Sequence, residues 1–143
     1  MRVFIDGGTT YLYVAAKQDS LTTIKRMPIG ANGDLGLPET YFDFSGNYGA
    51  AYSVNDLTFA ADGEMFLATD LPSPIVYINT DKSTGLLYPS LLLNSPALSF
   101  AWGIGFNLFY VRRQINDAAG ALVLPQTIVK LNLQKPGAPY YGM

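Results

Sequence analysis

Three short apolar runs separated by turn residues constrain the fold of this chain more than any other feature. They are Leu57–Ala61, Glu64–Thr69 and Ile75–Asn79. Asp62-Gly63 stands between the first two and is a strong hairpin signal, because glycine accepts the positive φ that a tight turn needs. The runs carry apolar residues on both faces, which is typical of strands buried on both faces. The stretch therefore predicts a small antiparallel sheet sandwiched between similar sheets.

Turn glycines recur along the chain and indicate internal repeats. Gly33, Gly85 and Gly137 fall at equal intervals. The earlier hairpin turns of the three units are less evenly spaced, and the length difference is taken up by the segment Gln114–Pro125. A period of ~40–50 residues with four strands per unit is typical of a β-propeller, whereas a meandering β-sandwich is the alternative. The sequence predicts one all-β domain over 1–143, with units at about 1–45, 54–93 and 97–143.

Each unit is expected to hold four antiparallel strands joined by polar turns. Two longer segments, Ser45–Asn55 and Gln114–Pro125, are expected to be loops, and only Tyr140-Tyr141 remains for a fourth strand in the third unit. The other predicted strands are Val3–Ile5, Thr10–Ala16, Thr22–Pro28, Glu39–Phe44, Leu86–Leu93, Leu98–Trp102, Leu108–Arg112 and Thr127–Asn132.

The middle unit resembles a known repeat. Phe59–Asp70 reads FAADGEMFLATD and Ile75–Asn79 reads IVYIN. A strand, an Asp-Gly turn, an aromatic strand ending near Asp and a further strand are similar to a blade of the NHL-repeat and SMP-30/gluconolactonase-like six-bladed β-propellers. The first and third units match this pattern loosely. The resemblance implies either a binding and scaffold module, with carbohydrate or protein as ligand, or a metal-dependent lactonase-like hydrolase with carboxylate and amide ligands in a central channel.

Three blades cannot close a ring, since a propeller needs at least four. An open arc would expose an apolar face on its first and last blades, and exposed apolar area of that size marks an interface. Two copies related by two-fold symmetry would close a ring of six blades. We therefore expect a homodimer forming a six-bladed propeller. The alternative is that the chain is part of a larger propeller.

Composition excludes several classes of function. Hydrophobic residues make up 49% of the 143 residues and charged residues 14%, so the chain can bury a large core. The net charge of −2 argues against a nucleic-acid partner. Cysteine and histidine are absent, which excludes Ser/His/Asp and Cys/His nucleophilic catalysis within this chain and the commonest transition-metal ligands. We therefore expect no catalytic residues.

Candidate ligand-binding residues cluster in the loops expected between blades. Aromatic rings with polar neighbours suit stacking on a sugar ring, although tyrosine also packs at the boundary between loop and core. Trp102 is expected to pack between blades rather than to bind a ligand. The candidate set is Tyr48, Tyr52, Asn55, Asp56, Arg112 and Arg113.

No metal site is predicted, although oxygen ligands for Ca²⁺ or Mg²⁺ could come from Asp6, Asp56 and Asp62. Asp6 and Asp62 stand in Asp-Gly turns, where the side chain usually accepts hydrogen bonds from backbone amides. No stretch reaches the ~20 apolar residues of a membrane span. No signal peptide is visible. The absence of cysteine and the Tyr/Asn/Gly-rich loops nevertheless favour a periplasmic or cell-surface location.

Overall fold

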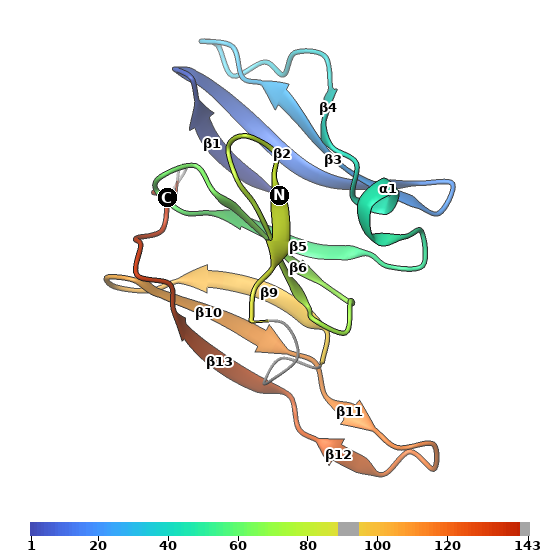
Figure 1. The fold of residues 1–143 in the computed structure, drawn as a ribbon. Coiled ribbons are helices and arrows are strands. Elements are labelled where there is room, and N and C mark those ends of the chain that lie inside the picture. The colour runs from blue at the N-terminus through green and yellow to red at the C-terminus, as the bar shows by residue number, and fades with distance from the viewer. Residues whose placement is uncertain (89–94, 141–143) are drawn as a thin grey trace.

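The computed structural model describes residues 1–88 and 95–140, and in them the chain is all-β apart from one short helix (Figure 1). The first sheet is an antiparallel meander in the order β1-β2-β3-β4, and helix α1 follows it. Its elements are β1 (Arg2–Asp6), β2 (Thr9–Gln18), β3 (Leu21–Pro28), β4 (Glu39–Phe42) and α1 (Phe44–Tyr48).

The second sheet repeats the same four-stranded order, β5-β6-β7-β8, and the third has the order β13-β10-β9. A separate hairpin, β11-β12, projects from the third sheet (Figure 1). The bounds are β5 (Val54–Phe59), β6 (Met65–Thr69), β7 (Ile75–Ile78), β8 (Thr84–Leu86), β9 (Ala97–Trp102), β10 (Asn107–Arg112), β11 (Ile115–Asn116), β12 (Leu122–Leu124) and β13 (Thr127–Asn132).

The prediction of four-stranded antiparallel units is confirmed for the first two sheets, and several boundaries differ. Phe44 begins α1 rather than ending a strand, because the Asp43 side chain caps the helix by accepting a hydrogen bond from Gly46 N. The expected loop Gln114–Pro125 contains β11 and β12. The strand predicted at Leu86–Leu93 overlaps β8 only at Leu86; Leu87 and Tyr88 belong to no strand, and residues 89–94 lie outside the described residues. Of the residues left for a fourth strand of the third unit, Tyr140 belongs to no strand and residue 141 lies outside the described residues.

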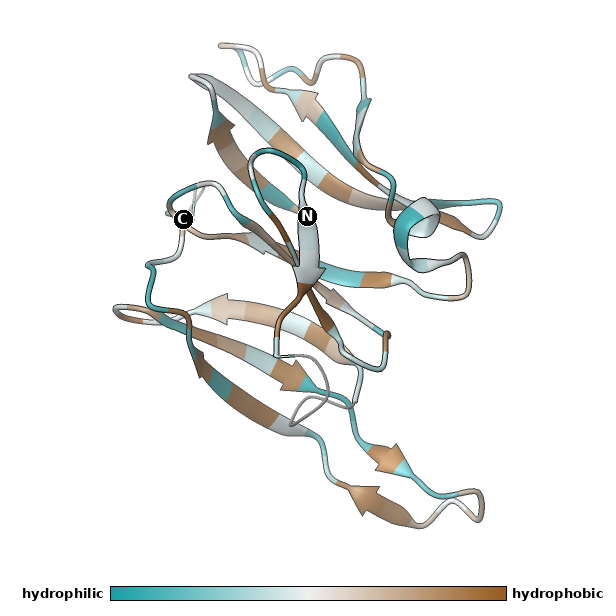
Figure 2. Ribbon diagram, viewed as in Figure 1, coloured by the Kyte–Doolittle hydropathy of each residue, from teal (hydrophilic) through white to brown (hydrophobic). Residues whose placement is uncertain are grey.

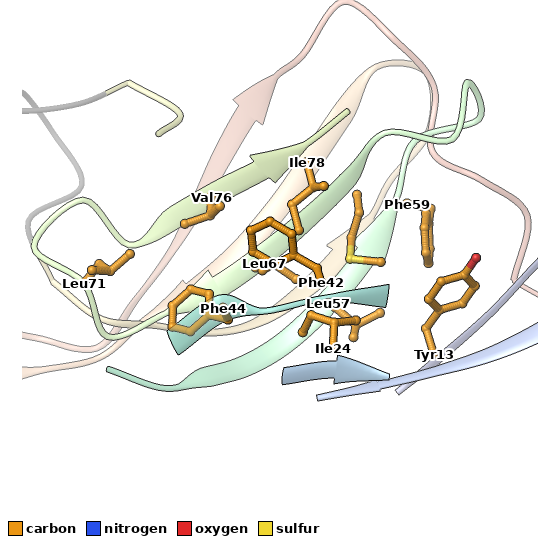
Figure 3. Packing of buried hydrophobic residues seen from close by; sticks show 11 residues of the cluster. Tyr13, Ile24, Phe42, Phe44, Leu57, Phe59, Leu67, Leu71, Val76 and Ile78 are labelled. Atoms are coloured by element: carbon orange, nitrogen blue, oxygen red, sulfur yellow. The ribbon is translucent and has the colours of Figure 1, made fainter. Parts of the chain in front are cut away.

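The first and second sheets pack face to face around one hydrophobic cluster (Figure 3). The first sheet contributes Tyr13, Ile24 and Phe42, and the second contributes Leu57 and Leu67 among others. Alternate residues of a strand point to opposite faces, so these side chains form one face of each sheet. Phe4 and Phe59 stack across the same interface, with ring centroids 4.3 Å apart.

The opposite face of the second sheet packs on the third sheet through a second cluster. The second sheet contributes Phe66 and Ile75 to this cluster, and the third sheet contributes Leu108 and Tyr110. All five residues of β6 are buried as a result. The prediction that the middle sheet is buried on both faces is therefore confirmed. The three sheets stack in chain order, and β5 lies beside both β1 and β9.

Trp102 also belongs to this second interface, as the sequence predicts. Its ring lies edge-on to Phe66, with centroids 6.2 Å apart, and packs against the second cluster. The C-terminal segment Pro136–Tyr140 then crosses to the free edge of β5. Ala61 N donates to Pro136 O and Ala138 N donates to Phe59 O, both at 2.9 Å. Thus the chain after β13 extends the second sheet rather than the third.

The two outermost faces of the stack carry apolar side chains and lack a covering sheet within the described residues (Figure 2). The outer face of the first sheet is called end face 1, and that of the third sheet end face 2. Strand register places Val3, Ile5, Leu12, Val14 and Met27 on end face 1. It places Ala101, Phe109, Val111 and Ile128 on end face 2.

Candidate functional site

A cavity of about 210 Å³ lies where β1, β5 and the C-terminal segment meet. Its walls include Val3 of β1, Thr58 and Phe59 of β5, and Tyr140. Arg2 also lines it and is the only charged side chain among the described residues of its walls. The cavity therefore combines apolar walls with a single guanidinium group.

Arg2 is held in place by the two neighbouring sheets. Its Nε donates to Leu57 O at 3.1 Å and its Nη2 donates to Phe100 O at 3.2 Å. The Asp56 carboxylate lies 3.6 Å from the same Nη2. The guanidinium carbon stands 5.1 Å from the centre of the Tyr140 ring, in cation–π geometry. One side chain from β1 thus connects β5, β9 and the C-terminal segment.

The cavity offers a cationic hydrogen-bond donor beside apolar walls. The Arg2 guanidinium carries five N–H groups, more than the hydrogen bonds just described use. The rings of Phe59 and Tyr140 offer apolar area beside it. Nucleophilic chemistry needs a hydroxyl or thiol next to a base, and the lining residues place no such base beside Thr58.

The structure brings three of the sequence-predicted site residues together. Asp56 accepts hydrogen bonds from Leu57 N and Phe100 N, both at 2.9 Å, and so ties β5 to β9. Asn55 Nδ2 donates to Ala97 O at 2.8 Å. Arg112 is the register partner of Ala97 and lies at the same end of the third sheet. In this structure the polar groups of Asn55 and Asp56 serve inter-sheet contacts.

The other three predicted residues lie apart from that group. Tyr48 bonds the Thr84 hydroxyl at 2.7 Å, and both Tyr48 and Tyr52 pack against the first hydrophobic cluster. Arg113 is exposed beside a separate cavity of about 360 Å³. The structure therefore divides the predicted set between three places. Their binding role stays a prediction.

Each of the three candidate metal-ligating carboxylates is paired with a different cation. Asp6 lies 2.7 Å from Arg26 Nη1, Asp56 is near Arg2, and Asp62 lies 2.8 Å from Lys135 Nζ. Within residues 1–88 and 95–140, no three acidic side chains come close enough together to share a metal ion. The metal-dependent alternative stays an untested prediction.

A second polar cluster lies within the first sheet, and the sequence does not single it out. The Arg26 guanidinium lies 4.4 Å from the centre of the Tyr11 ring and 5.4 Å from that of Tyr41. It also pairs with Asp6 and Glu39. Burial raises the pKa of Tyr41, and the Asp6 charge raises it further. The residues come from β1, β2, β3 and β4, so no local motif marks them.

Lys135 anchors the turn after β13 to the hairpin between β5 and β6, and this predicts an acid-labile contact. Burial alone would raise the pKa of Asp62, but hydrogen bonds from Lys135 and from Glu64 N outweigh it and lower that pKa. A carboxylate with a lowered folded-state pKa contributes stability above its unfolded pKa and loses it as the pH falls through the folded value. We expect the urea concentration at the unfolding midpoint to decrease as the pH is lowered below about 4. In Asp62→Asn this decrease should be less steep. Equal pH profiles for the two proteins would contradict this.

The comparisons with known proteins do not show a family for this chain. No family model matches the sequence, and a search of the curated proteins finds no match to it. What the described residues define is an all-β protein of stacked antiparallel sheets. In the described part of the chain, no helix is long and apolar enough to cross a membrane.

Proposed function

We propose that this chain is a noncatalytic binding and scaffold module whose three sheets are consecutive blades of an NHL-like β-propeller. A second copy closes the ring at six blades. The observation that carries the proposal is the pair of mainly apolar end faces, in which Lys25 stands opposite Val14 and Lys130 opposite Phe109. The stacked meanders and the adjacent inner strands β1, β5 and β9 support the blade arrangement.

The order of the faces favours head-to-tail closure between copies. Within the chain, the second sheet packs one face on the first sheet and its other face on the third. Joining end face 2 of one copy to end face 1 of the next repeats this relation. End face 1 carries aliphatic side chains and Met27, end face 2 carries aliphatic side chains and Phe109, and apolar burial contributes about 25 cal/mol per Å² before association costs. Two such junctions related by a two-fold axis close a six-sheet ring.

Protein is favoured over carbohydrate as the ligand class. The tyrosines predicted to stack on a sugar instead pack against the first cluster, and Tyr48 already has a hydrogen-bond partner in Thr84. The large uncovered surfaces are apolar sheet faces, which suit protein association. In the ring, each of the two copies would place its cavity beside Arg2 at the central channel.

Charged substitutions on each end face test the proposal. We expect the wild type to have twice the 15.5 kDa mass of the chain by light scattering on a sizing column. Val14→Glu on end face 1 and Val111→Glu on end face 2 should each give the monomer mass, because either change leaves a carboxylate buried at both junctions.

Leu37→Glu is the matched control, since Leu37 is 88% exposed in the connection between β3 and β4 and lies on neither end face. It should leave the dimer mass unchanged. Circular dichroism of the monomeric variants checks that the sheets remain folded. A monomeric wild type, or a dimer that both end-face variants leave intact, overturns the proposed ring.

A further inference from the structure

Within the described residues, the third sheet has no fourth strand of the kind that completes each of the other two. In the first sheet β4 pairs antiparallel with β3, and in the second β8 pairs antiparallel with β7. In the third sheet the corresponding strand, β13, pairs with β10 on one side only within the described residues. The chain that follows β13 crosses to β5 instead of turning back along β13. A six-residue strand edge is thereby left at the margin of the third sheet.

The hydrogen-bond pattern shows which backbone groups face this open edge. Gly103 N donates to Asn107 O, so the odd-numbered residues of β10 face β9. Leu133 N donates to Phe106 O, so the even-numbered residues of β10 face β13. The register pairs Leu108 with Leu131. It follows that the N–H and C=O groups of Ile128, Lys130 and Asn132 point away from β10.

The usual protections of a sheet edge are sparse along β13. The strand contains no proline, has no register shift against β10, and carries one charged residue, Lys130. All three residues with outward-facing backbone groups are exposed, and the Ile128 side chain is 70% exposed. Such an edge can pair with an incoming extended segment.

The chain itself shows what kind of strand completes a sheet of this type. β4 is four residues long, and its Glu39 pairs with Arg26 of β3 across the strand pair. Phe42 of the same strand is buried in the first cluster. The edge of the first sheet is therefore formed by a basic third strand, β3, and a fourth strand, β4, that contributes one acidic and one buried apolar residue.

We propose that β13 accepts a fourth strand from a partner protein: a short extended segment, antiparallel to β13, with an acidic residue opposite Lys130 and an apolar residue beside it. Antiparallel pairing of β13 with its own copy in the register centred on Lys130 is disfavoured, because it places two Lys130 side chains opposite each other. The proposal rests on the open backbone edge, which lies at the margin of the sheet, while the Ile128 and Lys130 side chains share end face 2 with Val111 and Phe109.

Amide exchange measured by NMR tests the proposal with a peptide probe taken from the chain. The probe is a synthetic peptide with the sequence of residues 38–43, PETYFD, added at millimolar concentration to the isotope-labelled full chain. We expect exchange at Ile128, Lys130 and Asn132 to slow by about tenfold or more. Val129 and Leu131, whose amides face β10, should change little.

A charge swap separates strand addition from nonspecific binding. The peptide with lysine in place of glutamate should bind the wild type more weakly than the acidic peptide does, and should bind Lys130→Glu more tightly than the acidic peptide does. Lys130 is exposed, so its replacement leaves the core intact. A peptide that is N-methylated along the edge facing β13 should not protect any of the three amides, because it cannot donate hydrogen bonds to the carbonyl groups of β13.

Three outcomes overturn the proposal. The first is the absence of protection at the three amides with the acidic peptide. The second is full protection in the dilute free protein, which would mean that the chain covers this edge itself. The third is protection that depends on protein concentration alone, which would identify a second copy as the occupant.

Discussion

Replacing Leu67 with alanine is expected to lower the free energy of unfolding by about 2–5 kcal/mol, the usual cost of a large-to-small change in a core. Leu67 is 0% exposed and lies in the middle of β6, the most deeply buried strand. It pairs with Leu57 on one side and Val76 on the other, in the cluster between the first and second sheets. Packed sheets on both faces of β6 leave little room for the cavity to collapse.

Urea unfolding followed by circular dichroism measures this change. Leu37→Ala is the matched control, because the same atoms are removed from a side chain that is 88% exposed. It should stay within about 0.5 kcal/mol of the wild type. A Leu67→Ala protein as stable as the control would show that the sheets do not pack as described.

Gly137→Ala is expected to destabilise the protein by about 1–3 kcal/mol, as overpacking does. A Cβ at this position would lie 2.2 Å from Trp102 Cγ and 2.4 Å from its Cδ2, far inside contact distance. Relief of that clash requires the C-terminal segment to leave β5 or Trp102 to move from the second cluster. Either change loses contacts, including the hydrogen bonds from Ala61 N to Pro136 O and from Trp102 N to Tyr140 Oη.

A double-mutant cycle measures the clash itself. In a Trp102→Ala background the two nearest atoms, Cγ and Cδ2, are removed and only Cβ at 2.7 Å remains close, so Gly137→Ala should cost less there than in the wild type. Tyr140→Phe serves as the milder comparison, since it removes one hydrogen bond, worth about 1 kcal/mol, and keeps the ring. Equal costs of Gly137→Ala in both backgrounds would contradict the contact between Gly137 and Trp102.

The candidate site was only partly predictable from the sequence. The sequence singles out Asp56 as a polar residue of a loop expected between blades; it lies in β5 instead, at the junction with Arg2. Arg2 and Tyr140 carry no local signal, since they stand near opposite ends of the sequence and meet only because the C-terminal segment crosses to β5. Long-range contacts of this kind depend on sheet packing, which hydrophobic period and turn residues do not encode.

By itself the sequence determined the all-β class, the two four-stranded meanders and the burial of β6 on both faces. Alternation of apolar residues and Asp-Gly or Asn-Gly turns are local properties of the chain, and they are sufficient to specify strands and hairpins. Tertiary structure alone decided that the segment after β13 pairs with β5, that Gln114–Pro125 forms a hairpin, and that Arg2 joins two sheets and the C-terminal segment. These outcomes follow from shape, as in the fit of Gly137 against Trp102, and from hydrogen-bond partners distant in sequence.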